Sequence, residues 1–260
     1  MRLSRLLAMA WESMKQRRLR TSLTTLGVVI GITAIIGLAS LGEGFRFEIK
    51  QRMESGFELK NITVIPGSLF AGLSRERFND NDIGNISTIS GVKLATGVMQ
   101  LGNVTLYDEQ TNRTTQAFVA TAVNYAEFIQ AFPDRFVFLG ETPKEYKNDT
   151  MVIGYNVNYP AENETTSFAA ANDTVLLTMD VVVQQPVSHV EQQNHTFTLG
   201  GILQKKGSPG ITNFDYWVFI PLQTAREIYA TNESDLIFVT VNNAEDSERI
   251  AQDIEHLFPP

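Results

Sequence analysis

The most regular apolar pattern lies near the start of the chain. Residues 21–42 carry no charged side chain, and their centre, LTTLGVVIGITAIIGLASL, runs from Leu23 to Leu41. An apolar run of this length suits a helix that crosses a hydrocarbon core of about 30 Å. We therefore expect a transmembrane helix over residues 21–42. A cleaved signal peptide would have a shorter apolar region, and its best cleavage site here, Ser40-Leu41-Gly42, is weak. A buried helix of a soluble protein rarely lacks charge over such a length.

A second helical pattern precedes this run, within residues 1–20. Apolar side chains recur at i, i+3, i+4, i+7, i+8 and i+11, which is one face of an α-helix, and they are Leu3, Leu6, Leu7, Ala10, Trp11 and Met14. Basic residues lie off that face, so we expect an amphipathic helix in the membrane interface. The alternative is a plain cytoplasmic extension of the spanning helix.

Two small residues within the apolar run are one helical turn apart. Gly27 and Gly31 form a GxxxG pair, and such pairs let membrane helices approach closely. Glycine is also common in membrane helices without any packing role. We take Gly27 and Gly31 as a candidate packing face.

The pattern after the apolar run changes from continuous to periodic. Phe45, Ile49 and Met53 are four residues apart in the charged stretch 43–57. We expect the spanning helix to continue here as a short stalk that stops at Gly56. Residues 58–260 then form the main, extracytoplasmic domain.

Short apolar stretches of strand and helix type alternate through residues 58–260. This pattern predicts an α+β domain with mixed sheets and two subdomains. Expected helices are 124–131, 221–229 with Pro221 at the first helical position, and 244–257. Expected strands are 61–65, 92–107 and 114–123 as a hairpin, 151–154, 174–184, 195–205, 217–220 and 236–241.

An acidic and amide-rich segment precedes three isoleucines in this domain. Asp80, Asn81 and Asp82 before Ile83 predict a helix N-cap. A calcium loop is the alternative, but an EF-hand would need an oxygen ligand where Gly84 stands.

Charge is distributed unevenly around the apolar run. Up to Gly42 there are six basic residues and one acid, a balance of +5, whereas 15 basic residues face 28 acids from Glu43 onward, a balance of −13. Because basic residues flank the N-terminal side, residues 1–20 are expected in the cytoplasm and the main domain outside. The net charge of −8 argues against nucleic acid as a partner, and membrane lipid is the expected contact of the basic segment.

Asparagine-linked glycosylation sequons are unusually frequent. Chance predicts two or three Asn-x-Ser/Thr triplets for this composition, and the chain has nine, all beyond the apolar run. This excess favours an exposed extracytoplasmic location. The candidate asparagines are Asn61, Asn85, Asn103, Asn112, Asn148, Asn163, Asn172, Asn194 and Asn232.

Motifs of enzyme chemistry are missing from the sequence. The chain has no cysteine, no HExxH and no GxSxG, and in the stretch nearest to a phosphate loop Gly207 takes the place of the lysine. The histidines His189, His195 and His256 are scattered, and Glu141 and Glu145 lie among lysines in a typical exposed pattern. We expect no catalytic, cofactor-binding or metal-binding residues.

The order of landmarks along nearly the whole chain resembles the N-terminal part of a MacB/FtsX-type ABC transporter permease. The landmarks are RLRTSLTTLGVVIGITAIIGLASLGEGF, NITVIPG, DIGNISTISGVKLATGV, VATAVNYAEF, FLGE, MVIG, FTLGGIL, VFIPLQTAREIY and DLIFVTVNNAEDSERIAQDIEHLF. The resemblance implies a transmembrane helix followed by a MacB-like periplasmic core domain. It also implies a separate cytoplasmic ABC ATPase subunit, a homodimer or permease pair, and transfer of ATPase motion to the outer domain for export, extraction or mechanotransmission. Finally, the resemblance implies an extracytoplasmic substrate or partner, whose identity is unknown.

The sequence departs from that family in two respects. A full permease of this type continues with three more membrane helices, whereas this chain stops at Pro260, so we expect a fragment of a longer permease, or a split or degenerate member. Residues 156–193 do not align well with the family.

Frequent sequons fit an archaeal-like cell surface better than a bacterial periplasm.

Two other functions are weighed against the permease. One is a single-pass surface sensor or ligand-binding domain, which would need a cytoplasmic partner because residues 1–20 leave no room for a signalling domain. The other is a membrane-anchored surface enzyme, which would need a cleft with convergent titratable groups.

Overall fold

The computed structural model divides the chain into two compact units, residues 1–55 and 56–260. Residues 11, 18–56, 60–67, 77–160, 166–183, 189–207 and 213–258 are described. In the first unit, helix α2 (Arg18–Gly56) is 39 residues long. At a rise of 1.5 Å per residue its length is about 58 Å. It ends at the residue where the sequence predicts the helix to stop.

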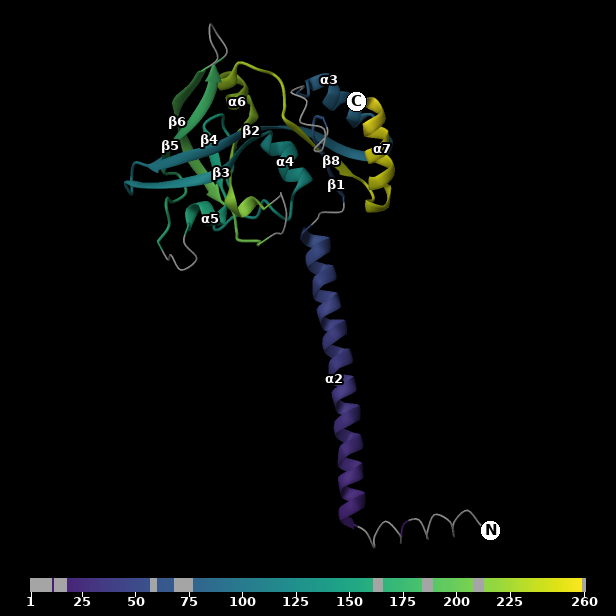
Figure 1. Ribbon diagram of the computed structural model, residues 1–260. Coiled ribbons are helices and arrows are strands. Elements are labelled where there is room, and N and C mark those ends of the chain that lie inside the picture. Colours follow the sequence, from purple (N-terminus) through teal and green to yellow (C-terminus); the bar gives the residue numbers. More distant parts are fainter. Residues whose placement is uncertain are drawn as a thin grey trace. The chain divides into compact units, whose positions relative to one another are not determined.

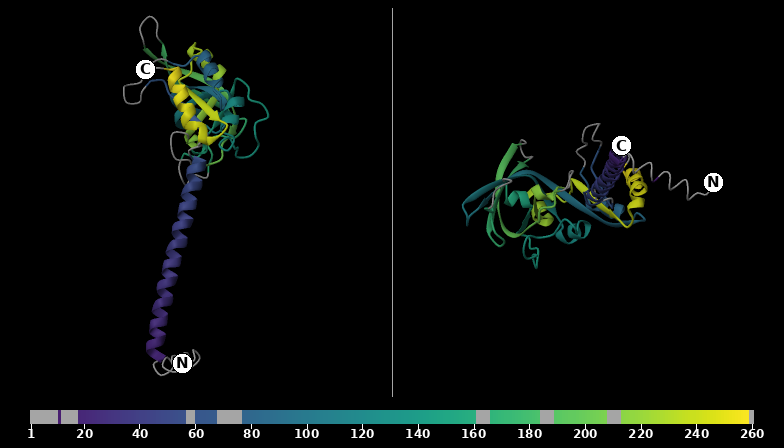
Figure 2. Two further views of the ribbon diagram at one scale, coloured as in Figure 1. Left: turned by 90° about the vertical axis from the view of Figure 1, so that its right-hand side faces the viewer. Right: turned by 90° about the horizontal axis from the view of Figure 1, so that it is seen from below.

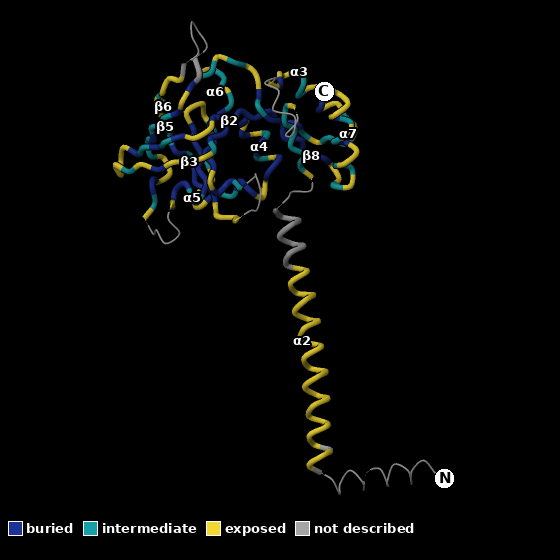
Figure 3. Tube along the Cα trace, in the orientation of Figure 1, coloured by how far each residue is buried: buried dark blue, intermediate teal, exposed yellow. Residues whose placement is uncertain are grey.

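Helix α2 contains a segment that is long and apolar enough to cross a membrane. This segment is Ser22–Phe47, with a mean hydropathy of 2.1, and its side chains are not buried within the chain. Figure 3 shows the described part of α2 as continuously exposed. Exposed leucines, valines and isoleucines along a whole helix are typical of contact with lipid or with other membrane helices.

The second unit is a mixed α/β domain (Figure 1). An eight-stranded sheet has the order β1-β8-β2-β3-β7-β4-β6-β5. The strands are β1 (Asn61–Val64), β2 (Val92–Asp108), β3 (Arg113–Val123), β4 (Thr150–Ile153), β5 (Thr174–Val183), β6 (His189–Ile202), β7 (Trp217–Pro221) and β8 (Leu236–Val241). The α-helices are α3 (Asp80–Ser87), α4 (Tyr125–Ala131), α5 (Tyr155–Asn158), α6 (Leu222–Tyr229) and α7 (Ser247–Leu257), with short 3₁₀ turns η1 (Phe214–Tyr216) and η2 (Ala244–Asp246).

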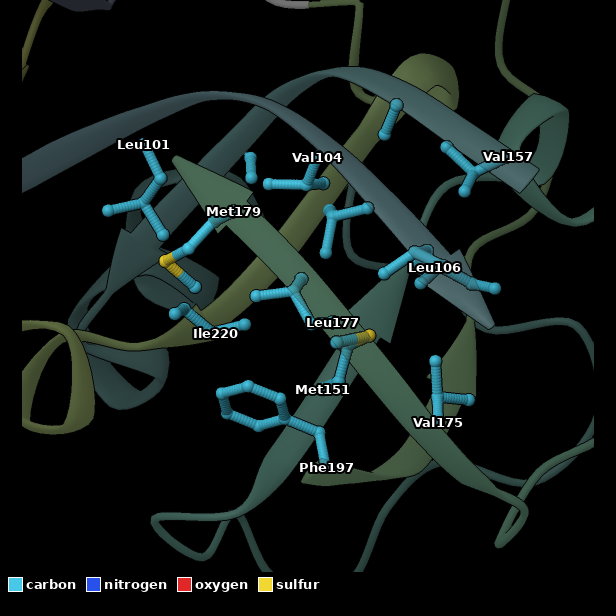
Figure 4. Packing of buried hydrophobic residues seen from close by; sticks show 14 of the residues in the cluster. Leu101, Val104, Leu106, Met151, Val157, Val175, Leu177, Met179, Phe197 and Ile220 are labelled. Atoms are coloured by element: carbon cyan, nitrogen blue, oxygen red, sulfur yellow. The ribbon is translucent and has the colours of Figure 1, made fainter. Parts of the chain in front are cut away.

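Part of the sheet closes into a ring. Strand β5 at the end of the strand order also pairs with β2, antiparallel, from Val104↔Met179 to Asp108↔Val175. The strands β2, β3, β7, β4, β6 and β5 therefore form a closed barrel. Apolar side chains from all of these strands fill its interior, as Figure 4 shows for Leu106, Met151, Leu177 and Phe197. Closure removes the free sheet edges that these strands would otherwise expose.

The first half of β2 leaves the barrel and forms a second lobe with β1, β8, α3 and α7. Figure 1 and the right-hand view of Figure 2 show β2 running from one lobe to the other. Ile86 of α3 and Ile250 of α7 pack against Ile237 and Val239 of β8. The two subdomains expected from the sequence thus take the form of two lobes on one continuous sheet.

A third apolar cluster lies around α4 and is mainly aromatic. Phe128 is fully buried, and its ring lies 4.8–5.7 Å from five other phenylalanine rings. These partners are Phe132, Phe136, Phe214, Phe219 and Phe238. Edge-on and tilted contacts of this kind add to the stability that burial provides.

Most predicted elements are confirmed, with corrections at their ends. The helix expected over 244–257 begins with the 3₁₀ turn η2 before α7, and the strand expected to reach 205 ends at Ile202. The N-cap of α3 is Asn79 rather than Asp80–Asp82, because Asn79 accepts from the backbone N–H groups of Asn81 and Asp82 while the Asp82 carboxylate accepts from the Asn79 N–H. Pro221 is the N-cap of α6 and not its first helical residue. Strand β6 begins at His189 instead of 195, because its polar first half pairs with β5.

Candidate functional site

The candidate packing face of the membrane helix lies on α2. A methyl group added at Gly27 or Gly31 would meet no atom within 4 Å. Side chains beside them, such as Leu26 and Ile30, are about 60% exposed. The two glycines therefore lie on a helix surface that no described part of this chain covers.

The expected interfacial helix falls almost entirely outside the described residues. This applies to Leu3, Leu6, Leu7, Ala10 and Met14. Trp11 is described as a helical residue whose side chain is 70% exposed. The interfacial helix stays a prediction.

The outer domain has an open cleft where two parallel strands end. Strands β3 and β7 pair in parallel, and Val123 lies opposite Pro221 at their carboxyl ends. Each strand leads directly into a helix, so the first turns of α4 and α6 lie at the same edge of the sheet. A cleft of about 580 Å³ lies there, closed on one side by the loop that carries Lys144, Tyr146 and Asn148. Crevices at the carboxyl ends of parallel strands are common ligand sites in α/β proteins.

Two stacked tyrosines line the base of this cleft. The rings of Tyr125 and Tyr146 are 4.5 Å apart and nearly parallel. The Tyr125 hydroxyl donates to the backbone carbonyl of Phe219, 2.8 Å away. Burial raises the pKa of Tyr125 well above its ordinary value, and the neighbouring Tyr146 adds to this. Burial also raises the pKa of Tyr146, so both rings are neutral at physiological pH.

Charged groups of both signs surround the rings. Arg226 of α6 lines the cleft and donates from Nη2 to Oδ1 of Asp80, 2.6 Å away. Lys144 and Glu145 line the cleft as well. Thr224 of α6 donates to the carbonyl of Asn148 and holds the loop against the helix. The cleft combines a stacked tyrosine pair with polar and charged side chains, which suits binding. Among the described residues that line it, no nucleophile is paired with a general base.

The sequon asparagines lie on both lobes of the outer domain. Asn61 is partly buried, its amide nitrogen donates to the Ala131 carbonyl at 3.1 Å, and its amide oxygen accepts from Thr240. Asn163 lies outside the described residues. The others are exposed: Asn85, Asn103, Asn112, Asn148, Asn172, Asn194 and Asn232.

The titratable groups noted in the sequence are not brought together where the structure describes their side chains, which excludes His189. His195 on β6 contacts Gln193, His256 is exposed on α7, and Glu141 and Glu145 are exposed. Partial burial lowers the pKa of His195. Among the described residues, no group of three histidine, aspartate or glutamate side chains is arranged to hold a metal ion.

Sequence reasoning missed the cleft. Tyr146 lies in a charged segment with no regular period, and Arg226 occupies an ordinary exposed position of an amphipathic helix pattern. One signal was available, because the strand ends before Asn124 and Pro221 were both expected. Their parallel pairing, which brings the two ends together, is not encoded in either segment alone.

Comparisons with known proteins give consistent relatives. A family model described as MacB-like periplasmic core domain matches residues 21–257. The macrolide export ATP-binding/permease protein MacB of Bdellovibrio bacteriovorus is 23% identical over 256 residues, which is 95% of this chain and 36% of that protein. The protein of the same name from Hahella chejuensis is 39% identical over 66 residues, 25% of this chain and 10% of that protein.

Solved structures of low sequence identity resemble the chain. The extracellular domain of the noncanonic ABC-type transporter YknZ from Gram-positive bacteria is 14% identical, with a TM-score of 0.49 over 76% of this chain and 91% of that one. The periplasmic region of MacB from Actinobacillus actinomycetemcomitans is 12% identical, with a TM-score of 0.48 over 76% and 82%. The chain spans about a third of the Bdellovibrio relative and a smaller share of the Hahella one.

Proposed function

The chain belongs to the MacB-like periplasmic core domain family, and from this membership we propose that it couples ATP hydrolysis by a separate ABC ATPase to movement of its extracytoplasmic domain. The family match and the apolar helix α2 make it a membrane protein with an extracytoplasmic domain, of the ABC transporter permease type. The finer statements on coupling, orientation and assembly are parts of the proposal.

The extent of the family match is the main support for this proposal. The family match begins at residue 21 and ends at residue 257, so it includes both the apolar helix and the outer domain. Helix α2 is unbroken from Arg18 to Gly56, and its length of about 58 Å exceeds a hydrocarbon core of about 30 Å. A continuous helix of this length can carry a displacement from the cytoplasmic side of the membrane to the outside.

The orientation that we propose is supported by the charge distribution. The balance of +5 before Glu43 and of −13 after it favours a cytoplasmic N-terminus. The basic residues before the span would then meet anionic lipid and lie on the side where an ATPase binds. No phosphate-binding loop occurs in the sequence, so ATP hydrolysis is assigned to another subunit or domain.

The assembly we propose pairs two permease chains through the face with Gly27 and Gly31. Small residues permit close backbone contact between membrane helices. Gly27→Leu and Gly31→Leu are expected to weaken association in detergent or bilayers, whereas Gly37→Leu, which lies about 100° around the helix, is the matched control. Equal weakening by all three changes would contradict this packing face.

The experiment that tests the permease function is isolation of the full-length protein from native membranes. Co-purification of an ABC ATPase whose hydrolysis rate depends on this chain is the expected result. An intact, monodisperse protein with no ATPase, against a positive control from the same membranes, would contradict it. That complex would also allow the transported or extracted substrate to be identified. Macrolide export is the activity in the names of the MacB relatives.

A second candidate function rests on the cleft. An open volume of about 580 Å³ with a stacked tyrosine pair favours a single-pass sensor or ligand-binding domain, since such sites have the size of small-molecule pockets. The two functions differ in one test: a sensor binds its ligand equally well with the ATPase absent, whereas cargo capture by the permease depends on ATP.

A further inference from the structure

An exposed phenylalanine and a free sequon asparagine share one shallow groove on the outside of the barrel. Phe118 of β3 is 74% exposed, more than any other described aromatic residue in the outer domain. Asn103 of β2 is exposed and lines the same groove of about 200 Å³. A single exposed aromatic ring is common on a protein surface. Phe118 is informative because a sequon asparagine lines the same groove.

The strand register explains why the two side chains line the same groove. Val104 and Ala117 are cross-strand partners, and both are buried in the barrel. Side chains alternate along a strand, so the neighbours Asn103, Thr105 and Phe118 face outward. The pairing of β2 with β3 is irregular on both sides of Gly102, which has a φ of +74°, so Asn103 lies next to a bulge.

The acceptor chemistry of Asn103 differs from that of Asn61. The Asn61 amide is partly buried and bonded through both its nitrogen and its oxygen. The Asn103 side chain is exposed and forms no hydrogen bond with the residues that the structure describes. An amide nitrogen must be free to become glycosylated, and Asn103-Val104-Thr105 supplies the required triplet.

The groove around Asn103 suits a single sugar ring. Its volume lies below the range of about 300–1,000 Å³ typical of drug-sized ligand sites. Phe118 offers an aromatic face, against which the C–H side of a pyranose can pack because that face is electron-rich. Polar groups for sugar hydroxyls come from Gln116, Thr178, Asp180 and Gln192.

We propose that Asn103 carries an N-linked glycan whose first sugar packs on Phe118 and occupies this groove. The proposal rests on the extracytoplasmic location given under the proposed function. According to this proposal, the glycan shields the polar outer face of the barrel. This face therefore does not bind a protein partner. Asn61 stays unmodified in the folded protein.

The first test is glycopeptide mass spectrometry of the full-length protein from native membranes. Occupied Asn103 and unoccupied Asn61 are expected. Occupancy at other exposed sequons without Asn103 would overturn the proposal but leave the outer location standing. No occupancy at any sequon would also overturn it, and labelling of an introduced cysteine, Glu109→Cys, by a membrane-impermeant reagent would then decide separately whether the location holds.

The second test asks whether the sugar contacts Phe118. In the glycosylated protein, Phe118→Ala is expected to lower the thermal midpoint by about 2–4 °C, the shift that corresponds to one modest contact in a domain of this size. In the Asn103→Gln background the same change is expected to have little effect. Val190→Ala, on an exposed apolar residue of β6 outside the groove, is the matched control. Equal shifts in both backgrounds would mean that the glycan does not pack on Phe118.

Discussion

Arg226 in α6 and Asp80 at the start of α3 form an ion pair, with 2.6 Å between Nη2 and Oδ1. The pair links the helix that lines the cleft to a helix of the other lobe. The Asp80 side chain is 64% exposed and the Arg226 side chain is 16% exposed. Arg226 therefore also packs against its neighbours, whereas Asp80 contributes mainly its charge.

Asp80→Ala is expected to lower the free energy of unfolding by less than about 1 kcal/mol, because water screens an exposed carboxylate. Arg226→Ala is expected to cost more, because it also removes a mostly buried aliphatic stem. A double-mutant cycle by urea unfolding at low and high salt gives the coupling, which should shrink with salt. An equal cost for both single changes, independent of salt, would contradict this description.

Phe128→Ala is expected to destabilise the outer domain by about 3–5 kcal/mol, the usual cost of removing a fully buried phenylalanine. Its ring contacts five other phenylalanines, so little relaxation can fill the gap. Phe118→Ala in unglycosylated protein is the matched control, and its 74% exposure predicts a change within about 0.5 kcal/mol. Similar losses for the two variants in chemical denaturation would argue against the aromatic cluster as described.

Gly154→Ala is expected to destabilise by about 1–3 kcal/mol, as overpacking does. A Cβ at this position would lie 2.1 Å from the carbonyl oxygen of Phe214, which is backbone and cannot swing away. Gly84→Ala in α3 is the control, since its Cβ would meet nothing within 4 Å and alanine favours the helix. A neutral Gly154→Ala variant would mean that β4 and η1 are not packed this closely.

Tyr125→Phe is expected to change how stability depends on alkaline pH. Burial raises the folded-state pKa of Tyr125, so its stabilising contribution is complete below the unfolded value of about 10 and is lost as pH rises through the folded value. At neutral pH the variant loses a buried hydrogen bond worth about 0.5–1.5 kcal/mol. Above about pH 10 the difference in unfolding free energy between the variant and the wild type should become smaller.

Denaturation midpoints measured from neutral pH to about pH 11 check this expectation. Tyr216→Phe, at an exposed position, serves as the control. Tyr146 and Tyr229 also have pKa values raised by burial. The Tyr125→Phe variant should therefore still lose part of the stability that the wild type loses at alkaline pH. A gap that stays constant or widens with pH would contradict a buried, neutral Tyr125.

Local elements of this fold could be predicted because their signals are local. The β2–β3 hairpin, α4 after its Asn124 cap, β8 and α7 each have a clear period or cap within the segment. The first half of β6 gave no signal, since Glu191, Gln192 and Asn194 are exposed and polar on a strand that only its β5 partner holds in place. The α3 cap was misplaced because four successive residues from Asn79 to Asp82 are all able to cap a helix.

Long-range features could not be predicted from such patterns. Closure of the barrel requires β2 to meet β5, which lies about seventy residues further along the chain. The cleft needs parallel pairing of Val123 with Pro221 and a loop that brings Tyr146 onto Tyr125. The order of the family landmarks along the whole chain indicated the permease domain, and no single motif did so.

The most direct test of the central claim is an ATP-dependent change in distance between α2 and the outer domain. The chain has no cysteine, so Glu43→Cys on α2 and Glu109→Cys in the β2–β3 turn would be the only sites for a pair of spin labels. Both labels are read in the full-length protein in membranes with its ATPase. We expect the distance distribution to shift between the nucleotide-free and ATP-bound states. An unchanged distribution while the ATPase hydrolyses ATP at its full rate would contradict the coupling function.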